Sequence, residues 1–179
     1  MILLSFDTEE FDVPREHGVD ISLEEGMRVS IAGTTCILDI LKANGVQATF
    51  FCTGNFAAHA PHIIQRIIDE GHEVACHGVD HWQPKDDDVF RSKEIVERVA
   101  QRPVYGYRQP RMFAVSDHDI QAAGFQYNSS LNPAFIPGRY MHLRTPRTWF
   151  MKDGVMQIPA SVSPHLRIPL FWLALHNFP

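Results

Sequence analysis

Apolar residues along the first hundred positions of the chain fall into short blocks that alternate with longer amphipathic ones. The short blocks predict strands, the first of them buried, at 2–6, 46–52 and 73–76. The longer blocks repeat apolar residues at helical spacing and predict helices at 22–44, 61–70 and 89–100. Strands that alternate with helices favour parallel pairing through helical crossovers, which gathers ligands at the carboxyl ends of the strands.

Turn residues mark the bounds of these elements. A loop with Pro14 and Gly18 follows the first strand, and Asn44-Gly45 ends the first helix. The second half is less regular, with short strands expected at 104–107 and 155–158, a helix at 117–124, and loops among the seven prolines after residue 127. No repeat or boundary interrupts the pattern, so residues 1–179 are expected to form a single domain.

Composition and charge narrow the function. Hydrophobic residues make up 45% and charged residues 21% of the chain, as in a soluble globular protein. The net charge of -5 offers no basic surface for nucleic acid or an anionic membrane, so a neutral or mildly cationic substrate fits better. The sequence starts without a basic leader or a long apolar run, and we expect a cytoplasmic protein without a membrane span.

Cys36, Cys52 and Cys76 fit neither a disulfide framework nor a metal-binding pair and are expected to be buried thiols.

Two histidines, His77 and His81, follow directly after the expected strand at 73–76. Their four-residue separation can bring both imidazoles to one side of a helical turn or a tight loop, as a zinc-like ion requires. A lone H-x-x-x-H is a weak signal, and two exposed histidines are the alternative.

Acidic residues gather where the first expected strand ends, in the segment 7-DTEEFD-12. In an extended strand end Asp7 and Glu9 point to the same side, so one could bind a metal ion while the other polarises a water molecule. A solvated acidic loop is the alternative.

Arg108 follows the expected strand at 104–107, and there it could hold a carboxylate of a neighbouring strand end through a bidentate pair. A surface arginine beside a proline is the alternative. Only the coincidence of the histidine, acidic and arginine groups at strand ends favours a functional site.

Together these segments resemble the polysaccharide deacetylase family of the NodB type. Its members begin with a strand that ends in an aspartate pair and carry H-[ST]-x-x-H and R-x-P motifs downstream. The resemblance is clearest in 47-QATFFCTGN-55 and 71-GHEVACHGVDH-81 and covers about residues 1–131. It implies an α/β fold, a distorted (β/α) barrel with fewer than eight repeats.

The resemblance also implies roles for the site residues. Asp7 matches the catalytic base, Arg108 the residue that orients it, and His77 and His81 two ligands of a divalent metal ion. The second aspartate of the family aligns with Thr8, which cannot bind as a carboxylate. Some relatives carry a D-x-[DE] pattern, and by that pattern Glu9 is the third ligand. Zinc is the favoured ion, although the same ligands suit cobalt, iron or nickel.

Three further departures from the family pattern stand out. Gly78 replaces a hydroxyl residue, and Arg111 replaces an aromatic one, with Phe113 close enough to line the pocket. The counterpart of the family's general acid is His176, three residues from the end, so we expect a chain truncated at its C-terminus or an acid from elsewhere. His176 is therefore not assigned.

The expected activity is hydrolysis of N-acetyl or O-acetyl groups on a polysaccharide, another glycan or a small N-acetylated substrate, with a backbone N–H of the 108–111 turn stabilising the oxyanion. Trp82 and the segment 127–149 are candidate groove walls, although Trp82, Phe125, Phe135 and Trp149 could equally be core residues. Two alternatives stay open. One is an allantoinase-like hydrolase of ureide C–N bonds, and the other is a non-catalytic carbohydrate-binding relative, suggested by Thr8.

Overall fold

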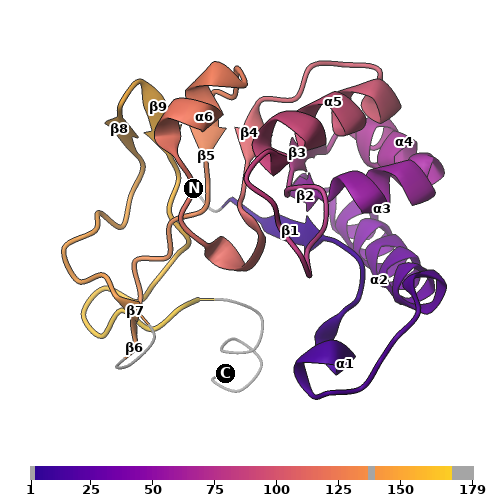
Figure 1. The fold of residues 1–179 in the computed structure, drawn as a ribbon, viewed down its shortest axis with the longest axis horizontal. Coiled ribbons are helices and arrows are strands. Elements are labelled where there is room, and N and C mark those ends of the chain that lie inside the picture. The colour runs from indigo at the N-terminus through magenta and orange to yellow at the C-terminus, as the bar shows by residue number, and fades with distance from the viewer. Residues whose placement is uncertain (1–2, 137–139, 171–179) are drawn as a thin grey trace.

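The computed structural model describes residues 3–136 and 140–170 of the 179-residue chain. Its centre is a seven-stranded sheet in the order β1-β2-β3-β4-β5-β9-β8 (Figure 1). The strands of this sheet are β1 (Ser5–Thr8), β2 (Thr49–Cys52), β3 (Glu73–Cys76), β4 (Gly106–Tyr107), β5 (Tyr127–Asn128), β8 (Phe150–Lys152) and β9 (Val155–Gln157). Neighbours from β1 to β9 pair in parallel, whereas β8 pairs with β9 antiparallel. A separate antiparallel pair joins β6 (Phe135–Ile136) to β7 (Tyr140–Met141).

Helices connect the parallel strands. They are α1 (Val13–Glu16), α2 (Leu23–Asn44), α3 (Gly54–His59), α4 (Pro61–Asp69), α5 (Asp88–Ala100) and α6 (Asp117–Ala122), with a 3-10 turn η1 (Pro110–Met112) after β4. Figure 1 shows α2 to α5 grouped beside β1 to β4, and α6 beside β5 and β9. This arrangement confirms the predicted parallel pairing through helical crossovers. No helix in the described part of the chain is both long and apolar enough to span a membrane.

Local signals account for the helix ends. The hydroxyl of Ser22 accepts a bond from the backbone N–H of Glu25 and caps α2, which ends at Gly45 in the left-handed region with φ 62°. The predicted helix at 22–44 is thus confirmed. The sequence prediction missed α1 in the loop around Pro14 and also missed α3, whose first turn is capped by Thr53.

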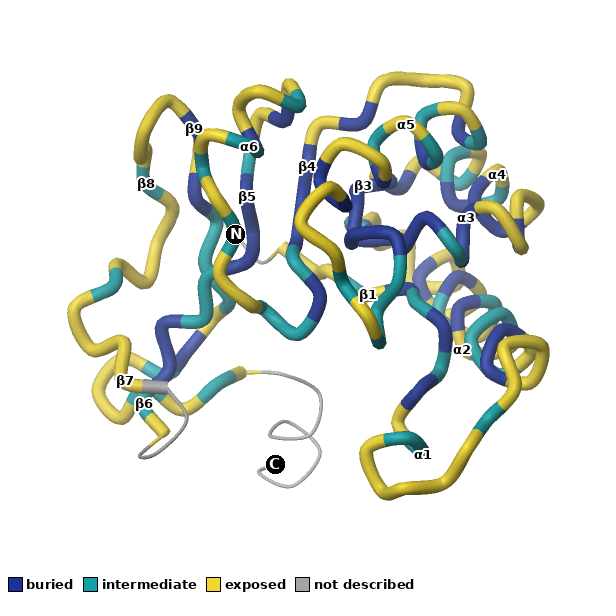
Figure 2. The backbone as a smooth tube through the Cα atoms, in the orientation of Figure 1, coloured by how far each residue is buried: buried dark blue, intermediate teal, exposed yellow. Residues whose placement is uncertain are grey.

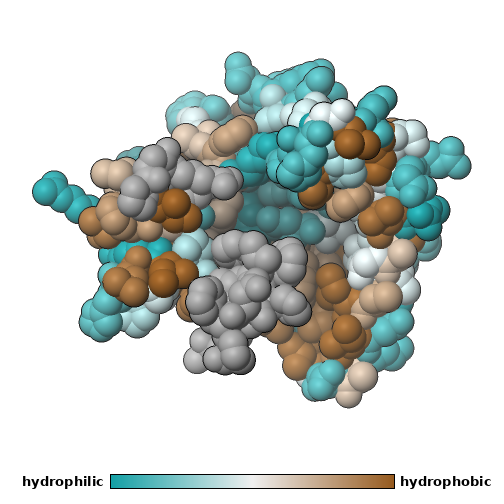
Figure 3. Space-filling view, turned by 90° about the horizontal axis from the view of Figure 1, so that it is seen from below, coloured by the Kyte–Doolittle hydropathy of each residue, from teal (hydrophilic) through white to brown (hydrophobic). Residues whose placement is uncertain are grey.

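The core lies between the helices and the strands, where the backbone is buried in Figure 2. Its largest fully buried side chains include Tyr107, Phe50, Phe56, Leu38, Ile64 and Ile67. These side chains come from the strands β2 and β4 and from the helices α2, α3 and α4. Burial of their apolar surface between sheet and helices holds the strand ends in fixed positions. The surface in Figure 3 has a hollow with hydrophilic residues on its floor and apolar residues nearby.

The first strand differs from its prediction. It runs from Ser5 to Thr8, later than the expected 2–6, and it is the first strand of the sheet order rather than a buried one. Leu3 is 72% and Leu4 40% exposed because β1 has a strand partner on one side only in the described residues. The shift puts Asp7 inside the paired strand, opposite Phe51.

The cysteines are free but not all buried. Cys52 and Cys76 end β2 and β3 inside the core, whereas Cys36 is exposed on α2, which contradicts the prediction for that residue. Burial raises the pKa of Cys76 to about 12 and also raises that of Cys52.

We expect native protein to react with a disulfide reagent such as DTNB at Cys36 alone, because Cys36 is exposed whereas Cys52 and Cys76 are buried. Spectrophotometric titration measures this, with Cys36→Ser as the control that removes the reaction. Rapid native reaction of the Cys36→Ser variant would contradict the buried positions of Cys52 and Cys76, which should react only in denaturant.

Candidate active site

The five predicted site residues meet at one edge of the sheet. Asp7 lies in β1, Glu9 one residue beyond it, His77 directly after β3 and Arg108 directly after β4. Because β1 to β4 are parallel, their carboxyl ends share this edge, and the loop after β3 brings in His81.

Glu9 and the two histidines form a group that could hold a metal ion. One potential ligand atom from each residue lies within 4.8 Å of the other two. Glu9 Oε2 is 3.0 Å from His77 Nε2 and 3.4 Å from His81 Nε2. The two imidazole rings are stacked, with centroids 5.8 Å apart.

Hydrogen bonding of the rings tests whether an ion fits. His77 Nδ1 lies 2.9 Å from the carbonyl oxygen of Arg108, and His81 Nδ1 lies 2.7 Å from Asp12 Oδ2. Both partners are acceptors, so each Nδ1 carries the proton and each Nε2 presents a lone pair towards Glu9. Glu9 Oε2 and His77 Nε2 are buried without a hydrogen-bond partner in the described structure. Three converging donor atoms, two of them buried without a hydrogen-bond partner, fit a divalent cation.

Asp7 lies beside this group and is anchored by Arg108. Arg108 Nη1 donates to Asp7 Oδ1 at 2.5 Å, while Asp7 Oδ2 lies 3.9 Å from His77 Nε2. One carboxylate oxygen is therefore fixed by the arginine, and the other faces the candidate metal position.

Two serines that were not predicted hold Arg108 in place. Its Nη2 donates to Ser129 Oγ at 2.9 Å and to Ser5 Oγ at 3.1 Å, and its guanidinium lies 3.9 Å from the ring centroid of Phe51. Ser5 is two residues before Asp7 in the same strand, so strand alternation could have indicated it. Ser129 directly follows β5, and the sequence carries no local signal for its contact.

The charges at this edge favour added positive charge. Burial alone would raise the pKa of Asp7, but His77 and Arg108 outweigh it and hold that pKa below its ordinary value. Burial would likewise lower the pKa of His77, but Asp7 and Glu9 outweigh it and raise that pKa. A proton and a metal ion compete for His77 Nε2, and the same two carboxylates attract either one.

Glu10 fixes the acidic segment 7–12 to the start of α3 through hydrogen bonds of its carboxylate. Its two carboxylate oxygens each accept a 2.7 Å bond, one from Thr53 Oγ1 and one from Asn55 Nδ2. Asn55 Nδ2 also donates to Asp80 Oδ2 at 3.1 Å. This network joins Glu10, next to Glu9, and Asp80, next to His81, to the start of α3. The sequence carries no local signal that predicts it.

Gly78 has a steric reason to depart from the family's hydroxyl residue. Its φ is +68°, and a Cβ built there would lie 2.9 Å from Cγ of Pro110. Glycine therefore allows the histidine loop to pack against the turn that follows Arg108.

The turn after β4 has few backbone donors left for a substrate oxyanion. The N–H of Arg108 bonds to the carbonyl of Cys76, that of Gln109 to Ser130 Oγ and that of Met112 to the carbonyl of Gln109. Pro110 has no N–H. Within this turn an oxyanion donor would have to be the N–H of Arg111, whose backbone is left-handed at φ 56°.

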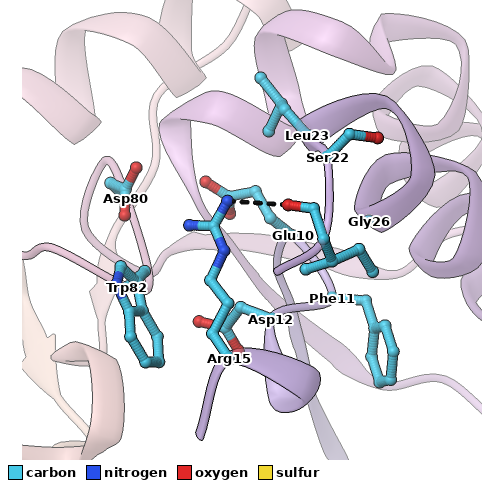
Figure 4. A pocket seen from close by; sticks show the side chains of 10 residues that line it. Glu10, Phe11, Asp12, Arg15, Ser22, Leu23, Gly26, Asp80 and Trp82 are labelled. Atoms are coloured by element: carbon cyan, nitrogen blue, oxygen red, sulfur yellow. Dashed lines mark hydrogen bonds between the residues drawn. The ribbon is translucent and has the colours of Figure 1, made fainter. Parts of the chain in front are cut away.

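Two arginine side chains lie close to the ring of Trp82, a candidate wall of the substrate groove. The guanidinium carbons of Arg111 and Arg15 lie 5.0 and 5.9 Å from the centroid of its ring. Trp82, Arg15 and Asp12 line a small cavity of about 30 Å³ next to the histidine loop (Figure 4). Phe125, weighed above as a core residue, is buried in the core, whereas Trp149, in the candidate wall segment, is 65% exposed.

A comparison with protein families adds independent support. Residues 14–127 match the family model described as polysaccharide deacetylase. The matched range includes His77, His81 and Arg108 but begins after Asp7 and Glu9. The place of Asp7 and Glu9 in the candidate site is therefore supported by their positions in the structure and not by the family match.

Individual relatives point the same way. The chain is 46% identical over 48 residues to the chitooligosaccharide deacetylase of Bradyrhizobium sp. (strain ANU 289), which is 27% of this chain and 22% of that protein. It is 23% identical over 155 residues to the peptidoglycan deacetylase of Helicobacter pylori (strain ATCC 700392 / 26695), which is 81% of this chain and 52% of that protein. The chain thus spans about a fifth and about half of these relatives' lengths.

Among solved structures, the chain is similar to a Mycobacterium smegmatis protein assigned to the polysaccharide deacetylases. The TM-score is 0.65 at 26% identity, over 89% of this chain and 58% of that one. This likeness confirms the predicted fold class. His176 lies outside the described residues.

We expect metal-depleted wild-type protein to take up about one zinc ion per chain and His77→Ala to lose it, because the variant removes a ligand from a three-residue group. Elemental mass spectrometry after re-exposure to zinc and desalting measures the ratio. His118→Ala, at an exposed histidine on α6, is the matched control and should bind like wild type. Equal zinc content in wild type and His77→Ala would contradict the site.

Proposed function

The chain belongs to the polysaccharide deacetylase family, and on this basis we propose that it is a metal-dependent hydrolase that removes acetyl groups from a glycan. One observation carries the proposal. The Asp7–Arg108 pair lies beside the Glu9, His77 and His81 group, with Asp7 Oδ2 3.9 Å from His77 Nε2. A base and a cation site at this separation can act on the same water molecule. We further propose that residues 1–179 form one catalytic domain.

The metal site has defined ligands in this proposal. Glu9 Oε2 and the Nε2 atoms of His77 and His81 would hold a divalent ion, with zinc favoured by two imidazoles and one carboxylate. When bound, such an ion supplies Lewis-acid activation of water and of the scissile carbonyl.

Asp7 is the proposed general base. Its Oδ1 is held by Arg108 at 2.5 Å, so Oδ2 is the oxygen left to accept a proton from the attacking water. The lowered pKa keeps the carboxylate ionised. Arg108 is a positioning residue, because its own proton stays in place while it fixes the orientation of the base.

Charge develops on the carbonyl oxygen as water attacks, and the N–H of Arg111 is the proposed backbone donor for it. The N–H groups of Arg108, Gln109 and Met112 are already bonded inside the protein. A single oxyanion donor contributes about 3 kcal/mol in other hydrolases.

An N-acetylated glycan is the proposed substrate class. The two relatives described above are named for chitooligosaccharide and peptidoglycan, and the net charge of -5 suits a substrate that is not strongly anionic. The replacement of the family's second aspartate by Thr8 does not argue against catalysis, because Glu9 supplies the carboxylate of the ligand group. Thr8 itself is buried in β1, 3% exposed.

Acetate release from zinc-loaded protein tests the proposal, with chitooligosaccharides, peptidoglycan fragments and allantoin offered in parallel. We expect acetate and a new free amine in equal amounts from at least one glycan. Turnover of allantoin alone would replace the proposal with ureide hydrolysis, and no turnover with zinc bound would favour a non-catalytic protein.

The Asp7→Asn variant should lose about 10²- to 10⁴-fold in kcat while keeping its zinc, since it removes the base but no ligand. The matched control is Asp20→Asn, an exposed aspartate in the loop before α2, whose kcat should stay near that of wild type. An Asp7→Asn variant with wild-type kcat would exclude Asp7 as the base.

A further inference from the structure

Asp12 occupies a helix-capping position but does not cap. It is the N-cap residue of α1, where an aspartate side chain usually accepts a backbone N–H of the first turn. Here its side chain makes no such bond, and Oδ2 lies 2.7 Å from Nδ1 of His81. The carboxylate is only 6% exposed, so it is committed to the histidine rather than to solvent.

The two candidate ligand histidines are held in different ways. His77 comes directly after β3 and bonds to the backbone carbonyl of Arg108, which is anchored to the adjoining strand end. His81 lies in the irregular loop between β3 and α5 and bonds to a carboxylate from a distant segment, 69 residues earlier in the chain. The orientation of His81 therefore depends on a side chain rather than on the sheet.

Asp12 has support of its own. Arg111 Nη2 lies 3.8 Å from Asp12 Oδ2, and Arg111 Nη1 bonds to Glu16 Oε1 at 2.9 Å. The same guanidinium lies 5.0 Å from the ring centroid of Trp82, the neighbour of His81. Arg111 thus balances the buried charge of Asp12 and connects α1 to the histidine loop. Asp12 and Trp82 both line the pocket drawn in Figure 4.

We propose that Asp12 is a positioning residue that sets the metal affinity of the site through His81. Its carboxylate keeps the proton on Nδ1, directs the Nε2 lone pair towards Glu9 and makes the imidazole a stronger ligand. Asp12 itself touches neither the ion nor the substrate. The inference rests on the proposed metal site.

The test is the zinc dissociation constant, measured on metal-depleted protein by competition with a chromophoric chelator. Asp12→Ala should weaken zinc binding by about 10- to 100-fold. Asp12→Asn keeps an acceptor oxygen without the charge and should recover part of that loss. Glu16→Gln is the matched control, because it removes a carboxylate beside the same arginine without touching His81, and its affinity should equal that of wild type.

A second readout separates positioning from a general loss of structure. In zinc-loaded, ¹⁵N-labelled protein, Asp12→Ala should lose the protected imidazole N–H signal of His81 and keep that of His77, which bonds to a backbone carbonyl. Zinc affinity unchanged in Asp12→Ala, or weakened equally in Glu16→Gln, would overturn the inference. Absence of zinc binding by wild type would overturn the proposed function itself, and this inference with it.

Discussion

The buried bond from His77 Nδ1 to the carbonyl of Arg108 is the contact on which the arrangement of the site depends. Together with the bond from the Arg108 N–H to the carbonyl of Cys76, it joins the ends of β3 and β4. From this junction the Arg108 side chain reaches Asp7 on β1, and the other ring nitrogen of His77 reaches Glu9. The proposed base Asp7 and the proposed ligands His77 and Glu9 are thus linked through one pair of residues, whereas His81 is held separately by Asp12.

Charge balance explains why this edge of the sheet suits a cation. Buried carboxylates are costly unless they are paired, and Arg108 satisfies only Asp7. Glu9 faces Nε2 of His77 and of His81. Among the described residues, Glu9 Oε2 and His77 Nε2 are buried without a hydrogen-bond partner. A divalent ion would offset the charge of Glu9 and use both nitrogen lone pairs. The match to the polysaccharide deacetylase family adds the class of reaction, but the matched range starts after Asp7 and Glu9.

Much of the fold could be predicted because its signals are local. The bounds of α2 follow from Ser22 and Gly45, residues that act on their own helix ends. The bounds of β1 do not, because they depend on pairing with β2, where Ser5 lies opposite Thr49 more than forty positions away. Cys36 was expected inside by residue type alone, whereas its position on the outer side of α2 depends on packing.

The same distinction divides the site. Strand ends and motif spacing were enough to single out Asp7, Glu9, His77, His81 and Arg108, which the structure brings together at one edge. The contacts of Ser129 and Glu10 could not be predicted, because each joins segments far apart in sequence. Asp12 was visible only as one more acid in a run of four, and its contact with His81 distinguishes it from a solvated loop residue. Sequence therefore indicated the proposed catalytic and metal-binding residues, and tertiary structure was needed to find the residues that hold them.

The central claim is that Glu9, His77 and His81 together bind the catalytic ion. Anomalous diffraction at the zinc edge, from crystals of zinc-loaded protein, tests it most directly. If these three residues hold the ion, one strong peak lies about 2.0–2.2 Å from Glu9 Oε2 and from Nε2 of both histidines. A protein that holds zinc in solution but places the peak elsewhere, or on fewer than these three residues, would contradict it.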